Sequence, residues 1–214
     1  MSNARILVTG GLGFIGSHTI VDLVESGYDV ISLDNEINSS IDVLSGIEKI
    51  TGKRIDNIHV DLSKKNKTLK AVKKYGRFDG LIHFAALKSV EESVYNPLLY
   101  FRNNVDGTIT TMLLMKDLDI PHLIFSSSCT VYGSPEKLPV TEDSPFGKAE
   151  SPYGASKQAC EILYEQYFNS ALKKSASSAI SAVSSASSVS SVSTRSTDSS
   201  GGASLSAIRF WYAI

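Results

Sequence analysis

The chain has 214 residues, a hydrophobic content of 42% and a formal net charge of −1 at pH 7. This length allows one sizeable core and is too short for two full domains, and the near-neutral charge gives no reason to expect a nucleic acid or an anionic membrane as partner. The N-terminus leads too soon into a strand-like run for a signal peptide, and no later stretch is apolar enough over a sufficient length to span a bilayer.

Short apolar runs alternate with longer stretches of helical periodicity, which is the pattern of βαβ units around a parallel sheet. The pattern predicts strands at 5–9, 29–33, 57–60, 80–84 and 122–126, and helices at 14–26, 41–51, 67–75, 97–116 and 151–168. The first and last of these strands contain continuous apolar runs, as expected where both faces of a strand are covered. The fold class is therefore α/β, a Rossmann-type doubly wound parallel sheet with helices on both faces.

A glycine-rich loop, TGGLGFIG at 9–16, lies between the first predicted strand and the first predicted helix. Gly10 permits the tight turn, Gly13 lets a pyrophosphate approach the backbone, and Gly16 lets the helix lie close to the strand. The start of the helix, at Phe14 and Ile15, offers free N–H groups and a positive dipole end to phosphates. A turn without a ligand can carry the same glycines, but the order of strand, loop and helix favours a dinucleotide site.

Acidic residues follow the second and third predicted strands. Asp34, with Asn35 after it, lies about twenty residues beyond the glycines, where a carboxylate accepts hydrogen bonds from the adenosine ribose. Since an acid there also repels a 2′-phosphate, NAD is favoured over NADP. Asp61, with Leu62 after it, is placed to reach the adenine, although it also fits a helix N-cap before Ser63.

Tyr153 and Lys157 lie four residues apart in the last predicted helix, a spacing that puts both side chains on one face. An ammonium beside a phenol stabilises the phenolate, so the tyrosine can act as a general base near neutral pH. The segment SSSCTVYG at 126–133 follows the fifth strand, and a hydroxyl there can hydrogen-bond a reacting sugar oxygen and relay its proton to Tyr153. A surface tyrosine–lysine pair and a plain serine turn are the alternatives.

The two cysteines, Cys129 and Cys160, have neither metal-ligand spacing nor a disulfide framework. We therefore expect no metal site and two reduced thiols in a cytoplasmic protein. Cys129 lacks a histidine nearby in the sequence, so we interpret it as a small packing residue and not as a nucleophile.

The composition changes near Ser175, and from there to Ser206 about half the residues are serine. Such a segment has little large apolar surface to bury, so we expect a flexible insert over residues 174–206. This divides the chain into an NAD-binding Rossmann domain at 1–173, the insert, and a last strand of the sheet at 207–214.

Together the motifs resemble the extended short-chain dehydrogenase/reductase family, and within it the UDP-galactose (UDP-glucose) 4-epimerases. The resemblance covers residues 5–168. It is carried by the glycine loop, LDN at 33–35 with NSS at 38–40, HFAALKSV at 83–90, NNV at 103–105, SSSCTVYG at 126–133 and SPYGASK at 151–157.

The resemblance implies epimerisation at carbon 4 of a UDP-hexose through a transient 4-keto sugar, as part of galactose metabolism. Tyr153, activated by Lys157, would take the proton of the 4-hydroxyl, Ser128 would orient that hydroxyl, and hydride would pass to a tightly held NAD. Both Tyr153 and Lys157 would also contact the cofactor. The further cofactor residues that it implies are Asn38, Ser39, Phe84, Ala85, Ala86, Lys88 and Asn103. Nucleotide-sugar 4,6-dehydratases place acids where this chain has Cys129 and Thr130, which disfavours elimination of water.

Family members continue with a strand of the type LRYFNPxG and a C-terminal domain that grips the UDP. Here Trp211, Tyr212 and Ala213 stand where phenylalanine, asparagine and proline are expected, and we expect the UDP-binding domain to be missing. Two other functions stay open: a nucleotide-sugar dehydrogenase or reductase that releases NADH, and a non-catalytic NAD-binding protein. Because family members commonly dimerise through the helices at 97–116 and 151–168, a homodimer is also expected.

Overall fold

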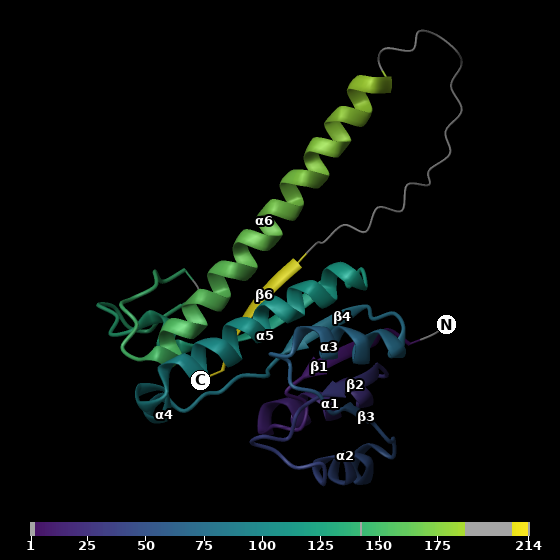
Figure 1. The fold of residues 1–214 in the computed structure, drawn as a ribbon, viewed down its shortest axis with the longest axis vertical. Helices are drawn as coiled ribbons and strands as arrows, with labels where there is room; N and C mark the ends of the chain where they lie inside the picture. The colour runs from purple at the N-terminus through teal and green to yellow at the C-terminus, as the bar shows by residue number, and fades with distance from the viewer. Residues whose placement is uncertain (1–2, 142, 187–206, 214) are drawn as a thin grey trace.

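The computed structural model describes residues 3–141, 143–186 and 207–213, with side chains described as far as residue 170. Its strands form one parallel sheet in the order β3-β2-β1-β4-β5-β6 (Figure 1). The strands are β1 (Arg5–Thr9), β2 (Asp29–Leu33), β3 (Asp56–Ile58), β4 (Gly80–His83), β5 (His122–Ser128) and β6 (Ala207–Ala213).

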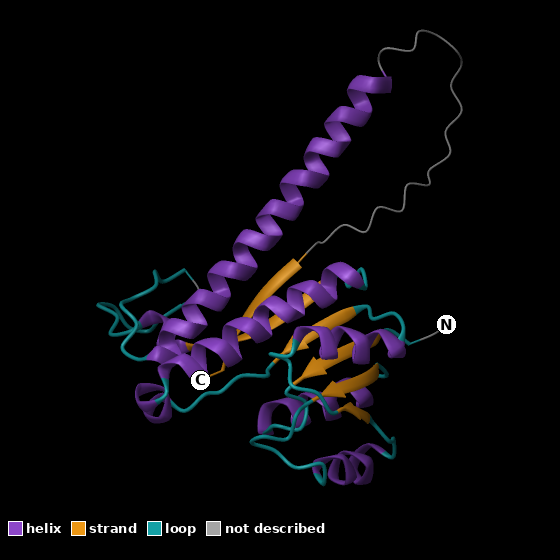
Figure 2. Cartoon of the chain, in the orientation of Figure 1, coloured by secondary structure: helices purple, strands orange, loops and turns teal. Residues whose placement is uncertain are grey.

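Helices connect the strands and cover the sheet (Figure 2). They are α1 (Phe14–Glu25), α2 (Val43–Thr51), α3 (Lys65–Val72), α4 (Val90–Tyr95), α5 (Pro97–Asp117) and α6 (Pro152–Ala186), with 3-10 turns η1 (Lys73–Tyr75) and η2 (Cys129–Tyr132). None of the described helices combines the length and the apolar character that a membrane span requires.

Two apolar clusters lie on opposite faces of the sheet, because successive residues of a strand point to opposite sides. On one face Leu7 and its neighbour Leu81 are buried together with residues of α3, α5 and α6. On the other face Val8 and its neighbour Ile82 are buried together with residues of α1 and α2. The predicted doubly wound α/β fold is confirmed.

Helix α4 was not predicted, and its local sequence explains why it forms. The Ser89 hydroxyl caps its first turn by accepting a hydrogen bond from the Glu92 N–H, and the helix ends at Tyr95, with Asn96 as its C-cap before Pro97. At six residues it is too short for helical periodicity to reveal it.

Helix α6 continues to Ala186, well beyond the predicted end at residue 168. The helix therefore extends into the first part of the segment predicted as a flexible insert, at residues 174–186. Alanine favours helix, and the chain has no glycine or proline between 169 and 186 to stop one. The part of the predicted insert at 187–206 lies outside the described residues, whereas the predicted last strand is present as β6, parallel to β5.

Candidate active site

A cavity of about 500 Å³ opens at the carboxyl ends of strands β1 to β5. It lies where the strand order reverses between β1 and β4, the position at which open α/β sheets bind ligands. All the predicted site residues line this cavity: Gly10, Gly13, Phe14, Ile15, Gly16, Asp34, Asn35, Asn38, Ser39, Asp61, Leu62, Phe84, Ala85, Ala86, Lys88, Asn103, Ser128, Tyr153 and Lys157. Lining residues that the sequence analysis did not assign are Leu33, Ile37, Val60, Leu87, Ser126 and Ser127.

The glycine loop forms one wall of the cavity, and Gly10 and Gly16 have no room for a side chain. Gly10 has a φ of 69°, and a Cβ there would lie 2.7 Å from the Ala85 nitrogen. A Cβ on Gly16 would lie 2.1 Å from the Gly10 carbonyl oxygen. Gly16 thus brings α1 close to the loop itself. The first turn of α1 carries no acidic residue that would compete with an anionic ligand at the helix N-terminus.

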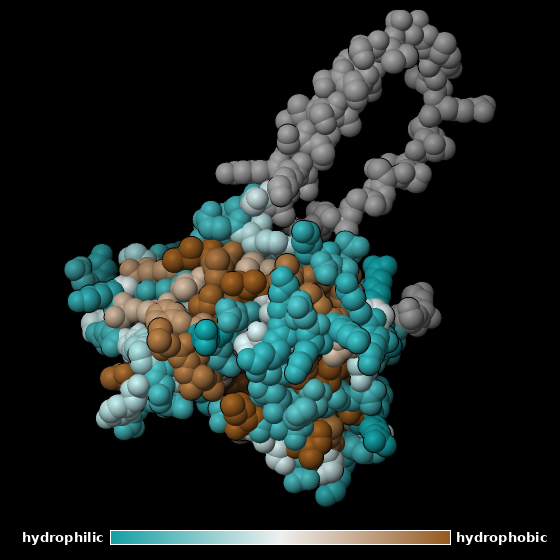
Figure 3. Space-filling model, in the orientation of Figure 1, coloured by the Kyte–Doolittle hydropathy of each residue, from teal (hydrophilic) through white to brown (hydrophobic). Residues whose placement is uncertain are grey.

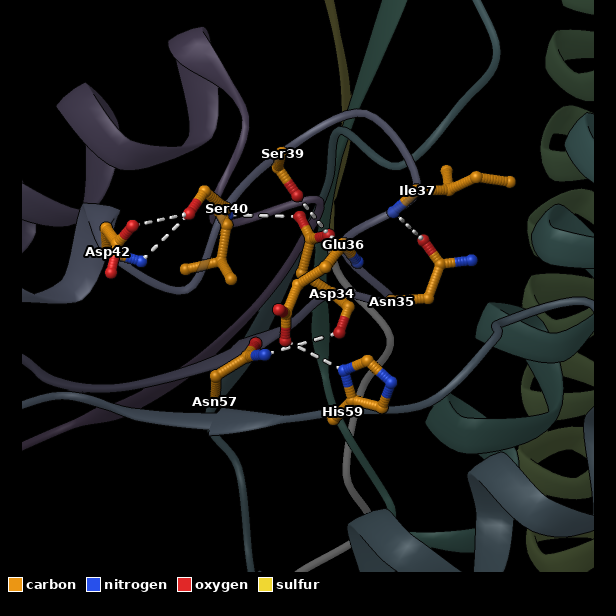
Figure 4. A network of polar contacts seen from close by, with 10 residues as sticks. Asp34, Asn35, Glu36, Ile37, Ser39, Ser40, Asp42, Asn57 and His59 are labelled. Atoms are coloured by element: carbon orange, nitrogen blue, oxygen red, sulfur yellow. Dashed lines mark hydrogen bonds and ion pairs between the residues drawn. The ribbon is translucent and has the colours of Figure 1, made fainter.

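Asp34 joins the glycine loop to the loop after β2 (Figure 4). One carboxylate oxygen accepts a hydrogen bond from the Leu12 N–H at 3.1 Å. The other accepts from the Glu36 N–H at 2.9 Å and from the Ser39 hydroxyl at 2.8 Å. The carboxylate is therefore fixed at the cavity wall by groups from both loops.

Two further contacts join the loop after β2 to strand β3 and to the residue that follows this strand, and sequence analysis gave no sign of them. His59 Nδ1 lies 2.8 Å from Glu36 Oε1, and Asn57 Nδ2 donates to the Asp34 carbonyl oxygen at 3.2 Å (Figure 4). Asp61 lines the cavity, yet it also accepts hydrogen bonds from the N–H and the hydroxyl of Ser63. The alternative of a helix N-cap is wrong, because α3 begins at Lys65 with Lys64 as its N-cap, and the contact of Asp61 with Ser63 is a local turn before the helix.

Asn104 of α5 holds the loop after β4. Its Oδ1 accepts from the Leu87 N–H at 2.9 Å, and its Nδ2 donates to the Leu87 carbonyl oxygen at 3.1 Å and to the Ser156 hydroxyl at 2.9 Å. Asn103, the residue selected from the sequence, lines the cavity and donates to Asn104 Oδ1 at 3.0 Å. Both asparagines belong to the NNV motif, and the helix register decides which of the two points at the loop.

The predicted catalytic side chains are brought together at the junction of β5 and α6, and all three are buried. Lys157 Nζ donates to the Ser126 carbonyl oxygen at 2.8 Å and lies 4.7 Å from the centre of the Phe125 ring. Ser128 is hydrogen-bonded to Tyr153, and its Oγ accepts from the Thr130 hydroxyl at 3.0 Å. The arrangement places a phenol, a hydroxyl and an ammonium at one end of the cavity.

Burial dominates the electrostatics of this group. It raises the pKa of Tyr153, and the hydrogen bond from Ser128 works in the opposite direction. It lowers the pKa of Lys157 to about 8. Lys157, whose ammonium donates to the Ser126 carbonyl oxygen, is not among the groups that shift the Tyr153 pKa here, so the stabilisation of the phenolate by Lys157 stays a prediction.

His83, at the end of β4, is a second buried titratable group near Lys157. Burial, and then the charge of Lys157, lowers its pKa to about 3, so its ring is neutral at physiological pH. Its Nδ1 lies 2.6 Å from the Thr9 hydroxyl. Within the described residues, no group of three or more His, Cys, Asp or Glu side chains is arranged to hold a metal ion.

Residues 7–196 match the family described as GDP-mannose 4,6 dehydratase. The chain belongs to this family. Similar curated members are UDP-glucose 4-epimerases, among them that of Dictyostelium discoideum, which is 47% identical over 161 residues, 75% of this chain and 46% of the relative. The Bacillus subtilis epimerase is 46% identical over 158 residues, 74% of this chain and 46% of the relative. The chain thus spans about half the length of the curated relatives it matches.

Solved structures of UDP-glucose 4-epimerases are also similar to this chain. UDP-glucose 4-epimerase from Bifidobacterium longum, in complex with NAD+ and UDP, superposes with a TM-score of 0.75 at 42% identity, covering 78% of this chain and 50% of that one. The Thermus thermophilus epimerase, a complex with NAD, gives a TM-score of 0.69 at 33% identity, covering 78% and 51%. The resemblance to the UDP-glucose 4-epimerases predicted from the motifs is confirmed.

Proposed function

We propose that the chain catalyses NAD-dependent epimerisation at carbon 4 of a UDP-hexose, interconverting UDP-galactose and UDP-glucose. The observation that carries the proposal is that Tyr153, Lys157 and Ser128 line the same cavity as the glycine loop and Asp34. The proton acceptor Tyr153 and the loop that would bind the dinucleotide therefore line the same cavity. Epimerases of similar sequence and fold, solved with NAD and UDP, support the same conclusion.

The residues of the cavity fit NAD. A Cβ on Gly10 would meet the Ala85 backbone and one on Gly16 the Gly10 carbonyl oxygen, so glycine at both positions is what allows the tight loop before α1, of the kind that binds a pyrophosphate. The N-terminus of α1 supplies N–H groups, and Asp34 supplies a carboxylate for the adenosine ribose. The same carboxylate would repel a 2′-phosphate, which favours NAD over NADP.

NAD, when bound, would supply the hydride acceptor for carbon 4 and a positive ring charge near Tyr153. The Tyr153 phenolate would accept the proton of the sugar 4-hydroxyl, which the Ser128 hydroxyl would orient by a hydrogen bond. Lys157, as a cation one helical turn away, would favour the phenolate. Tyr153 would hold the proton and return it to the 4-oxygen once the sugar presents its opposite face.

The dehydratase reaction in the family description is less well supported by these residues. Elimination of water needs an acid to protonate the departing hydroxyl. The two positions after Ser128 carry Cys129 and Thr130, and the Thr130 hydroxyl is hydrogen-bonded to Ser128. Neither side chain can protonate a leaving group as a carboxylic acid does.

Conversion of UDP-galactose to UDP-glucose by the purified chain with added NAD tests the proposal. Tyr153→Phe removes the proton acceptor and is expected to lower kcat at least ~100-fold. Tyr167→Phe is the matched control, because it makes the same change in the same helix away from the cavity. Net accumulation of NADH would instead identify a dehydrogenase, and NAD binding without turnover would identify a non-catalytic protein.

We further infer a homodimer formed through α5 and α6. Figure 3 shows apolar side chains gathered on the side of the molecule where α4, α5 and α6 lie. Each of these helices has an exposed large side chain: Tyr95 of α4, Leu98 of α5 and Ile162 of α6 are exposed by 76%, 77% and 49%. A second copy would cover this surface. Sedimentation should give a dimer for the chain and a monomer for Leu98→Glu with Ile162→Glu, whereas a monomeric wild-type chain would contradict the inference.

We also infer a cytoplasmic role in galactose metabolism. The metabolic role follows from the proposed substrate, UDP-galactose, and the compartment is supported by Cys129, which is exposed, and Cys160, which is buried, since both are free thiols. A reducing compartment keeps thiols in this form.

A further inference from the structure

Three consecutive serines at the end of β5 each meet a different residue of α6. Ser128 is hydrogen-bonded to Tyr153, and the Ser126 carbonyl oxygen accepts from Lys157 Nζ. The Ser127 hydroxyl donates to the Glu161 carboxylate. Since Tyr153, Lys157 and Glu161 are spaced four residues apart, they lie along one face of the helix. The reaction described above uses the first two and does not use Glu161.

Glu161 is as deeply buried as the catalytic side chains. Its exposed fraction is 5%, against 4% for Lys157. A carboxylate is unfavourable in such surroundings unless it has hydrogen bonds and an opposite charge nearby. Ser127 provides a hydrogen bond, and Lys157, one helical turn earlier, interacts with Glu161 through its charge.

The charge on Lys157 depends on its neighbours. Burial lowers its pKa to about 8, while Cys160 and Glu161 act to raise it. The other titratable groups around Lys157 are His83 from β4 and Tyr153 from α6. His83 is neutral, and burial raises the pKa values of Tyr153 and of the Cys160 thiol, so none of these three carries a negative charge near pH 7. This leaves Glu161 as the carboxylate that counters the effect of burial.

We propose that Glu161 is a positioning residue of the active site, whose carboxylate, held by Ser127, keeps the buried Lys157 protonated. The inference rests on the proposed function, because the protonation of Lys157 matters to a site that uses Tyr153 as its base. Glu161 itself lies behind this pair and does not line the cavity.

NMR titration of lysine labelled with carbon-13 at Cε measures the pKa of Lys157 directly. Glu161→Gln keeps the size of the side chain and an acceptor for Ser127 but removes the charge, so the Lys157 pKa is expected to fall below its wild-type value. Glu165→Gln is the matched control on an exposed position of the same helix, and it should leave that pKa unchanged. An unchanged pKa in Glu161→Gln, or an equal fall in Glu165→Gln, would overturn the proposal.

A second measurement needs no substitution, should Glu161→Gln fail to fold. In the wild-type chain the carbon-13 shift of Glu161 Cδ should be that of a carboxylate at pH 7, and the shift of a carboxylic acid would overturn the proposal. Neither measurement requires turnover. A failure of the epimerase proposal can therefore be told apart from a failure of the proposal for Glu161. In an active chain, Glu161→Gln should also move the alkaline limb of the rate profile to lower pH.

Discussion

At the scale of single residues, the neighbours Asn103 and Asn104 have different tasks: Asn104 stabilises the loop after β4, and Asn103 lines the cavity. Asn104 is 2% exposed and bonds both backbone groups of Leu87, whereas Asn103 lines the cavity. Since adjacent residues of a helix point about 100° apart, one faces the loop and the other faces the cavity. The two side chains should therefore affect different properties of the chain.

Asn104→Leu should lower the free energy of unfolding by about 3 kcal/mol, because it leaves the N–H and C=O of Leu87 without their partner. Asn103→Leu should change it by less than about 1 kcal/mol while weakening NAD binding. Urea denaturation followed by circular dichroism measures the free energy of unfolding of both variants. Equal losses of stability in the two variants would show that the contacts of Asn104 have no special weight.

The sequence allowed the candidate site residues to be named but not their contacts. Spacing alone put Tyr153 and Lys157 on one helix face, and the glycine loop was evident from its order between strand and helix. The direction of the Lys157 ammonium, toward the Ser126 carbonyl oxygen, depends on how α6 packs against β5. That tertiary contact, like the one between Glu161 and Ser127, leaves no pattern in the sequence.

At the scale of elements, the buried strands were the easiest to predict and the helix ends the hardest. All five predicted strands are present, and each of their ends lies within two residues of the prediction. Continuous apolar runs mark such strands, because helices cover both faces of the sheet. The extension of α6 to Ala186 was missed because a serine-rich composition was judged by its small apolar surface and not by its lack of helix breakers.

Helix α2 offers a direct test of two glycines in different conformations. Gly46 lies inside the helix, where an added methyl group would meet no atom within 4 Å, and Gly52 ends the helix with a φ of 68°. Gly46→Ala should therefore raise the free energy of unfolding by about 0.5–1 kcal/mol. Gly52→Ala should lower it by about 1 kcal/mol, since alanine is strained at positive φ. Thermal unfolding of both variants measures these effects, and a stabilised Gly52→Ala would contradict the assignment of the helix end.

At the scale of the whole molecule, buried His83 makes stability depend on pH. Its pKa falls from 6.5 in the unfolded chain to about 3 in the fold, so the unfolded chain binds more protons between these values. Stability is therefore lost as pH falls from 6.5 toward 3. His83→Gln should lose less stability than the wild type over this window, measured by urea denaturation at several pH values. His18→Gln, at an exposed position, is the control. If the free energy of unfolding of His83→Gln fell with pH as steeply as that of the wild type, the role of His83 would be refuted.

The central claim is that one cavity binds NAD beside Tyr153 and Lys157, and calorimetric titration of the nucleotide-free chain with NAD tests it most directly. The wild-type chain should bind NAD, and bind it more tightly than NADP because of Asp34. Gly16→Ala should abolish binding, since its Cβ would lie 2.1 Å from the Gly10 carbonyl oxygen, whereas Gly46→Ala should bind as the wild type does. A folded wild-type chain that does not bind NAD would contradict the account.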